Sequence, residues 1–188
     1  MAPVVRLWLD TWREGHSVIE AAFSGVWTEI LTLTAEFLTE GSGHYILLQC
    51  EEDPDVLIVL MGYDCKELGQ KIGAAIDERV TSAMDYVSPT ELLDMDLDIT
   101  DLPLDSGKIA VVLSESEPAH LDSLPGRGIW AEPGPTILIP DEGFDPDKPR
   151  ERKWVHIASS KDADDLKTLG TVRNFIPIME THMNSQPA

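Results

Sequence analysis

Residues 55–63 constrain the fold more than any other part of the chain. If this run is extended, both of its faces are apolar: Val56, Ile58 and Leu60 lie on one, and Leu57, Val59 and Met61 on the other. A strand with one face in water alternates apolar with polar residues instead. We therefore expect helices to cover one face and a second sheet to cover the other. That sheet comes from a partner subunit or from the second half of the chain, and we expect the function in a chamber between the two sheets.

The length of 188 residues, 43% of them apolar, is enough for one large domain or two small ones with a real core. No apolar run approaches the roughly 18 residues that a membrane span requires. The first ten residues read as a strand rather than as a secretory signal. Two cysteines, Cys50 and Cys65, are too few for a disulfide scaffold, so we expect a reduced, cytoplasmic protein.

The charge distribution is strongly acidic, with 34 acidic and 14 basic residues and a net charge of −20. No basic residue lies between Arg79 and Lys108, whereas the stretch 85–105 is crowded with aspartates and glutamates. Such a surface repels phosphate backbones, so we expect no nucleic-acid partner. The charge favours solubility, and the alternatives are a nucleic-acid mimic or a docking face for a basic partner.

The first half of the chain has the pattern of alternating strands and helices. Residues 4–12 predict a strand whose face with Arg6, Trp8, Asp10 and Trp12 is amphipathic and suits the lining of a cavity. Residues 17–40 predict a helix that starts at a capping box. Residues 44–52 and 55–63 predict a hairpin, and 65–80 a second helix. This order is typical of the split β-α-β-β-α-β, ferredoxin-like arrangement.

The rest of the chain is less regular. Ser88–Glu91 predicts a short helix start, while 92–99 fits either that helix or an edge strand. Strands are expected at 108–113 and 153–158. Between them, 114–152 reads as a long Pro- and Gly-rich loop with a strand only at Thr136–Ile139, and 161–182 reads as mostly helical. We therefore divide the chain into a barrel half, 1–105, and a degenerate second half, 106–188, with a C-terminal helix.

No catalytic motif is present, and the five histidines lack metal-ligand spacing, so we expect neither a metal nor a cofactor. The candidates are polar residues on strands that also carry aromatic side chains, because a histidine, a tyrosine and a carboxylate in an aromatic chamber can move protons without a cofactor. As catalytic residues we predict His156, His44, Tyr63 and Asp10, and as substrate-binding residues Trp8, Trp154, Met61 and Tyr45.

The strand-helix-hairpin-helix layout, in which the apolar third strand passes through Met61-Gly62-Tyr63-Asp64 into a helix, resembles the dimeric α/β-barrel superfamily. This group includes antibiotic-biosynthesis-monooxygenase-like and EthD-like proteins. The resemblance covers residues 3–105 and, if the second half repeats the first, implies a tandem version. It implies two ferredoxin-like sheets closed around a small hydrophobic ligand, either in a homodimer or within one chain, and a histidine and a tyrosine as catalytic groups in the cyclase-like members.

Three readings of function stay open at this point. The first is a cofactor-independent cyclase, lyase or monooxygenase that acts on an aromatic or polyketide-like compound of secondary metabolism. The second is a non-catalytic ligand-binding or protein-interaction module of the same fold, with 85–105 as its acidic docking face. The third is a structural or regulatory module that binds a basic partner, whose association would weaken with salt.

Overall fold

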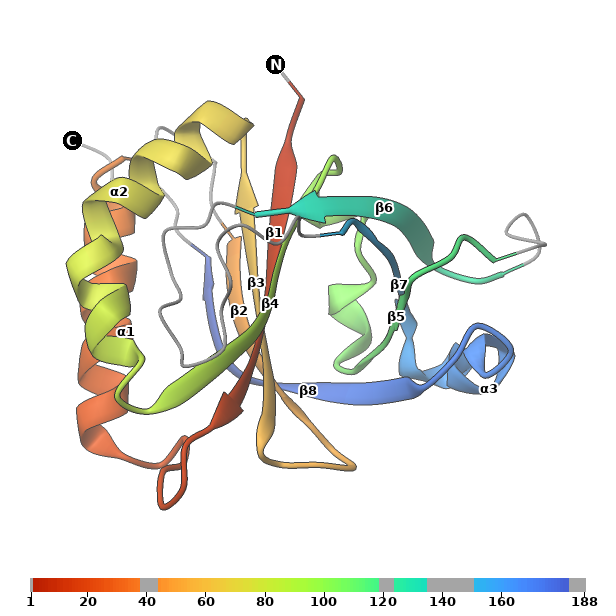
Figure 1. The fold of residues 1–188 in the computed structure, drawn as a ribbon, viewed down its shortest axis with the longest axis horizontal. Coiled ribbons are helices and arrows are strands. Elements are labelled where there is room, and N and C mark those ends of the chain that lie inside the picture. Colours follow the sequence, from red (N-terminus) through yellow and green to blue (C-terminus); the bar gives the residue numbers. More distant parts are fainter. Residues whose placement is uncertain (1, 38–43, 119–123, 135–150, 183–188) are drawn as a thin grey trace.

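The computed structural model describes residues 2–37, 44–118, 124–134 and 151–182, with side chains described as far as residue 179. Eight antiparallel strands close into a barrel in the order β1-β3-β2-β8-β5-β7-β6-β4 (Figure 1). The strands are β1 (Val4–Trp12), β2 (His44–Cys50), β3 (Val56–Tyr63), β4 (Val87–Met95), β5 (Ile109–Ser114), β6 (Arg127–Pro133), β7 (Lys153–Ser159) and β8 (Val172–His182). The main helices are α1 (Ala21–Ala35), α2 (Lys66–Ala83) and the short α3 (Ala163–Leu166).

Strand β3 is buried along its whole length, as its apolar pattern predicts. It lies between β1 and β2, with Leu9 opposite Ile58 on one side and Leu48 opposite Ile58 on the other. One face of β3 points into the barrel and the other lies under the helices. The barrel closes within a single chain, so the second half of the chain supplies the second sheet and no partner subunit is needed for closure.

The interior of the barrel is a continuous apolar core. Every strand contributes to it, and the side chains from β1 and β3 are those at alternate positions: Val5, Leu7, Leu9, Val56, Ile58 and Leu60. On the outer face of the same sheet, α1 and α2 pack side by side (Figure 1). They bury a second cluster, rich in aromatic side chains, that includes Trp8, Trp12, Phe23, Trp27, Tyr45 and Tyr63.

The second sheet, β8-β5-β7-β6, faces the first across the barrel (Figure 1). Its outer face carries much less helix than the first sheet does. There α3 buries Leu166 against Ala110, Val112 and Ala158, which are small enough to let this short helix lie close to the strands. The two halves of the barrel therefore differ in what covers them, although both are four-stranded.

The connector between β4 and β5 fills one part of the barrel. It contains two 3₁₀ helices, η1 (Ile99–Asp101) and η2 (Leu104–Ser106), and lies between the two sheets in Figure 1. Ile99 and Leu102 are buried in the interior core. Gly62 of β3 makes room for Ile99, since a Cβ there would lie 2.6 Å from Ile99 Cγ2. The connector thus closes the barrel near the first residues of β1.

The structure corrects several predictions in the less regular part of the chain. Ser88–Glu91 does not begin a helix: it belongs to β4, which is paired on both sides, with β1 and β6, and so is not an edge strand. The second half of residues 161–182 is strand β8, and only a 3₁₀ turn and the short α3 precede it. The predicted C-terminal helix is therefore wrong, and β6 was missed inside the expected loop. Thr136–Ile139 lies outside the described residues.

The long predicted helix is shorter than expected at its N-terminal end. Glu20 reaches back to the Ser17 backbone N–H at 2.7 Å, so half of the predicted capping box forms, but the helix itself begins at Ala21. In the part of the chain that the structure describes, none of the helices is both long and apolar enough to cross a bilayer.

Candidate functional site

The amphipathic face of β1 does not point into the barrel. Trp8 and Trp12 belong to the aromatic cluster between the first sheet and the two long helices, whereas Leu7 and Leu9 point inward. Because side chains alternate along a strand, Arg6 and Asp10 share the outer face with the tryptophans. The expectation that this face lines a cavity holds only for the space under α1 and α2. The barrel interior instead receives the apolar face.

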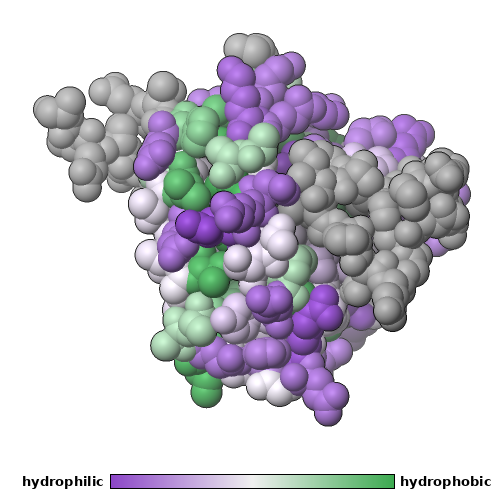
Figure 2. Space-filling model, turned by 60° about the vertical axis from the view of Figure 1, so that its left-hand side comes forward, coloured by the Kyte–Doolittle hydropathy of each residue, from purple (hydrophilic) through white to green (hydrophobic). Residues whose placement is uncertain are grey.

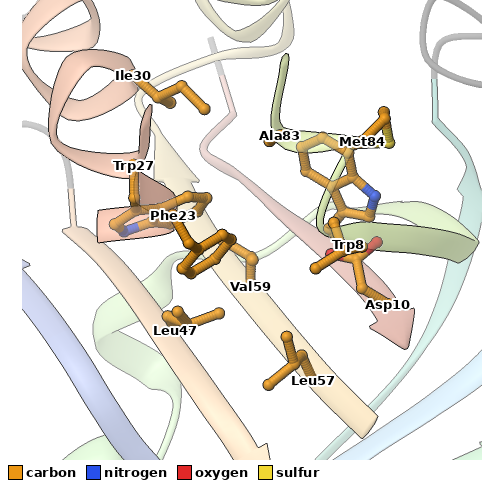
Figure 3. Close-up of a pocket in the computed structure, with 11 residues that line it drawn as sticks. Trp8, Asp10, Phe23, Trp27, Ile30, Leu47, Leu57, Val59, Ala83 and Met84 are labelled. Carbon is orange, nitrogen blue, oxygen red and sulfur yellow. The ribbon is translucent and has the colours of Figure 1, made fainter. Parts of the chain in front are cut away.

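Asp10 lies in a small pocket in that layer, between the strands and the two helices (Figure 3). Its residue exposure is 3%, and no hydrogen bond or ion pair satisfies its Oδ1. The pocket wall is otherwise apolar or aromatic: Trp8, Phe23, Trp27, Ile30, Leu47, Leu57, Val59, Ala83, Met84 and Val87. Burial without a cation raises the pKa of the Asp10 carboxyl to about 8, so this acid keeps its proton at neutral pH.

A register shift in the β1–β4 pairing falls next to Asp10. Leu9 lies opposite Glu91 and Asp10 opposite Pro89, so Thr90 is the extra residue of a bulge. The Thr90 hydroxyl donates to the Leu9 carbonyl oxygen at 3.0 Å, which satisfies a backbone acceptor at this irregularity. Pro89 has no N–H to offer. Bulges of this kind re-aim side chains and are frequent next to active sites.

The pocket is narrow, with a cavity of about 10 Å³, which is close to the space that one water molecule needs. Three buried polar atoms on the outer face of β1 lack partners among the described residues: Asp10 Oδ1 and the indole nitrogens of Trp8 and Trp12. One or two hydrogen-bonding atoms of a bound molecule would satisfy such groups. A molecule larger than water requires the covering side chains to move, and half-buried Met84 is the least buried of them on α2's side.

The other end of the same face holds a buried ion pair. Arg6 Nε donates to Asp94 Oδ1 at 2.7 Å, and a second guanidinium nitrogen donates to Oδ2 at 3.1 Å. Burial opposes the charge on Arg6, but the hydrogen bond to Asp94 and the Coulomb interactions with Tyr63, Asp94 and Tyr45 together outweigh it, so the pKa of Arg6 is raised. The guanidinium carbon lies 5.6 Å from the centroid of the Tyr63 ring. Arg6 and Asp94 escaped prediction as partners because they are 88 residues apart in the chain.

Tyr63, Tyr45 and Met61 gather around this ion pair rather than around Asp10. The two tyrosine rings meet edge to face with centroids 6.1 Å apart, and the Tyr63 hydroxyl donates to Met61 Sδ at 3.4 Å. Burial raises the pKa of both tyrosines, so neither is primed to lose its proton. Arg6 and Asp10 are four residues apart on β1, a separation of about 13 Å.

His156 and Trp154 lie on the outer face of the second sheet, away from both groups. His156 is 2% exposed, and its Nε2 lies 2.7 Å from the Pro125 carbonyl oxygen. Gly128, on the neighbouring strand, leaves room for both side chains: a Cβ there would lie 2.4 Å from Trp154 and 2.7 Å from His156 Nδ1. His44 begins β2, opposite His182 in the pairing with β8.

Among the predicted catalytic and binding residues, Asp10 and Trp8 line one pocket together. Neither His156 nor His44 lines this pocket. Within the described ranges, no three side chains of histidine, cysteine, aspartate or glutamate are grouped in a way that could hold a metal ion. The site residue with the most unusual environment is thus Asp10.

The acidic stretch 85–105 is exposed in part: Asp85, Asp96, Asp101 and Asp105 are exposed, whereas its other acidic residues are half-buried or buried. Asp94 is buried against Arg6, Glu91 pairs with Lys153, and Asp101 lies 3.5 Å from Arg127. On the helical side of the molecule, apolar patches are interspersed among hydrophilic side chains (Figure 2). An acidic docking surface at 85–105 stays a prediction.

Comparison with known proteins places the fold but not the activity. No protein-family model matches the chain, and no curated protein matches it. Among solved structures it is similar to a proposed chlorite dismutase, with 9% identity, a TM-score of 0.51, and coverage of 95% of this chain and 96% of the other. It is also similar to a proposed monooxygenase from Fusobacterium nucleatum, with 7% identity, a TM-score of 0.54, and coverage of 97% and 95%. The chain thus shares its overall fold, a closed barrel of eight strands with helices on the outside, with these two structures.

Proposed function

We propose that the chain is an enzyme that moves a proton on a small apolar compound, with Asp10 as the acid–base group. The compound would lie between the first sheet and α1 and α2, against Trp8, Phe23 and Trp27. The observation that carries this proposal is the burial of Asp10, whose Oδ1 has no partner among the described residues. An unpaired buried carboxyl destabilises the fold, and such groups cluster at functional sites.

The chemistry follows from the protonation state. With a pKa of about 8, Asp10 is protonated at neutral pH and is a donor, suited to protonate or hydrogen-bond a carbonyl or phenolate oxygen of the substrate. Closer to pH 8 the ionised form accepts a proton from a carbon next to a carbonyl. The apolar wall excludes water and strengthens both interactions.

Within this class, a cyclase, a lyase and a cofactor-independent monooxygenase remain the candidate reactions, with an aromatic or polyketide-like substrate. Each includes a proton transfer at an oxygen or at an activated carbon, which one carboxyl in a closed aromatic pocket supports. The similarity in fold to a proposed monooxygenase is compatible with this class. The catalytic roles of His156, His44 and Tyr63 stay predictions. None of these three residues lines the Asp10 pocket, so Asp10 is the first residue to test.

We also infer that the chain is a tandem version of the barrel, with halves close to 1–105 and 106–188. Numbered within its own half, each sheet has the order 4-1-3-2: β4-β1-β3-β2 and β8-β5-β7-β6. Because both sheets come from one chain, a homodimer is not required to complete the barrel. In the second half, the short α3 stands where α2 stands in the first.

The test is deuterium exchange in D₂O, which detects proton transfer before the full reaction is known. A panel of aryl ketones and β-diketones is incubated with the protein, and loss of the proton next to the carbonyl is followed by NMR. We expect the wild type to accelerate exchange of at least one compound and Asp10→Asn to lose at least about 100-fold of that acceleration. Met84→Ala, which widens the pocket, should accelerate the exchange of larger compounds of the panel as well.

The matched control is Asp85→Asn, the same chemical change at an exposed residue next to Met84. It should exchange the panel at the wild-type rate. If Asp10→Asn and Asp85→Asn are equally active, Asp10 is not the acid–base group. Saturable binding of panel members without any exchange would instead favour the non-catalytic ligand-binding module.

A further inference from the structure

A second cavity lies inside the barrel, on the opposite side of the first sheet from Asp10. Its volume is about 210 Å³. The lining residues come from β1, β3, β5 and β8 and from the turn before β8: Leu9, Ile58, Val111, Leu113, Thr171, Arg173 and Phe175. The strands on either side of it belong to the two different sheets, so the cavity is the unfilled part of the chamber that they enclose.

The cavity opens at one end of its lining. Along β8, Phe175 is fully buried, Arg173 is half-buried and Thr171 is exposed, and on β5 Val111 is buried whereas Leu113 is half-buried. The connector that carries Ile99 fills the barrel elsewhere, next to Gly62. Gly62 is four residues, or about 13 Å, from Ile58 along β3. The unfilled space is therefore open on one side and backed by the plugged core on the other.

Arg173 gives this cavity its chemistry. It lies opposite Val111 in the β5–β8 pairing, on the side of β8 that faces the barrel interior. No described side chain forms a hydrogen bond or ion pair with it, in contrast to Arg6, Arg79 and Arg127. In a chain with 34 acidic and 14 basic residues, the lining holds one guanidinium and no carboxylate. A partly desolvated guanidinium prefers a bidentate anion such as a carboxylate.

We propose that this cavity binds a small apolar monocarboxylate, with the carboxylate on Arg173 at the mouth and the apolar body against Leu9, Ile58 and Phe175. A dry cavity of about 150 Å³ holds a benzene ring, so the observed 210 Å³ has room for a ring with a short chain. The site is separate from the proposed active site, since Leu9 and Asp10 point to opposite faces of β1.

The experiment titrates 3-phenylpropionate and its neutral counterpart, 3-phenylpropanamide, into the full chain by calorimetry and NMR. The acid should bind saturably and at least about tenfold more tightly than the amide, because a hydrogen bond to a charged group contributes that much. Arg173→Met should remove that preference and leave binding of the amide unchanged. Arg79→Met, the same substitution at an exposed arginine on α2, should preserve it.

A second variant tests the location without relying on charge. Leu113→Trp fills the mouth and should abolish binding of both compounds while the circular dichroism spectrum stays that of the wild type. Asp10→Asn should bind both compounds like the wild type, which separates this site from the proposed active site. Equal affinity for acid and amide, an unchanged preference in Arg173→Met, or no saturable binding of either compound would each overturn the proposal.

Discussion

A buried carboxyl lies at each end of the helix-covered face of β1, Asp94 of β4 beside Arg6 at one end and Asp10 at the other, and the two differ in their partners. Asp94 receives two hydrogen bonds from Arg6, whereas Asp10, which is equally buried, has no partner for its Oδ1 among the described residues. Both lie on the outer face of the first sheet, so burial alone does not separate them. A buried carboxylate with a paired cation is typical of structure, whereas a buried carboxyl without one, which destabilises the fold, points to function.

The largest effect is expected from Arg6→Met, which leaves Asp94 buried without its partner. Breaking a buried ion pair from one side costs about 3 to 5 kcal/mol of unfolding free energy. Urea denaturation followed by circular dichroism measures the loss. Replacing both residues, Arg6→Met with Asp94→Leu, should recover much of it. If Arg6→Met alone were as stable as the wild type, the ion pair would not stabilise the fold, and Asp94 would no longer differ from Asp10 in this respect.

Asp10→Asn is expected to change stability in the opposite direction. The pKa of Asp10 is raised on folding, so the folded state holds a proton that the unfolded chain releases, and wild-type stability falls as pH rises from about 4 to 8. The slope is on the order of 1 kcal/mol per pH unit. The variant should lack this contribution and be more stable than the wild type at pH 7 by about 1 to 4 kcal/mol.

Unfolding curves at several pH values between 5 and 8 check this prediction, with Asp85→Asn as the control for a lost surface charge. A wild type and an Asp10→Asn variant whose stabilities run parallel across this range would mean that Asp10 is ionised in the folded protein. The contrast with Asp94 would then disappear.

A smaller effect is expected at Tyr63. Tyr63→Phe removes only the hydroxyl that donates to Met61 Sδ and keeps the ring that lies beside Arg6. Stability should fall by about 1 kcal/mol or less, and deuterium exchange of the ketone panel should continue at the wild-type rate. If Tyr63→Phe lost deuterium exchange without losing stability, the catalytic site would lie near Tyr63 and the Arg6–Asp94 ion pair and not at Asp10.

The smallest effect is expected from Arg79→Met, the exposed counterpart of Arg6→Met. Arg79 Nε pairs with Glu29 at 2.7 Å, but both side chains are well exposed. Such pairs contribute about 0.2 to 1 kcal/mol, and added salt weakens them further. Urea unfolding at low and at high salt should give nearly the same value as the wild type. A large loss would show that burial is not what distinguishes Arg6.

Much of the first half of the fold was predictable because its periodicities are strong. The strand at 4–12, the hairpin and the helix at 65–80 are confirmed, as is the covering of both faces of β3. The second half was harder. Its strand at 172–182 contains Pro177 and a register shift in its pairing with β2, and its helix has four residues, so the alternation there was weak.

The candidate site was predictable only in part. Asp10 and Trp8 were identified from their shared face on β1, and this pair lies in one pocket. Arg173 was missed because it lay in a segment that was read as helical, where its alternation with Phe175 had no meaning. The sequence offered no way to choose between His156 and His44, and neither of them lines the pocket that holds Asp10.

The sequence by itself determined that water is excluded from both faces of residues 56–63, because neither face carries a polar side chain that could be solvated. It could not determine which face looks into the barrel and which lies under the helices, since two apolar faces contain no difference that orients them. Tertiary structure decided this. The pairing of β1 with β4 brought Arg6 to Asp94, 88 residues away in the chain, and not to Asp10. The closure of the barrel brought β8 opposite β1 and β3 and placed Arg173 at the mouth of a cavity.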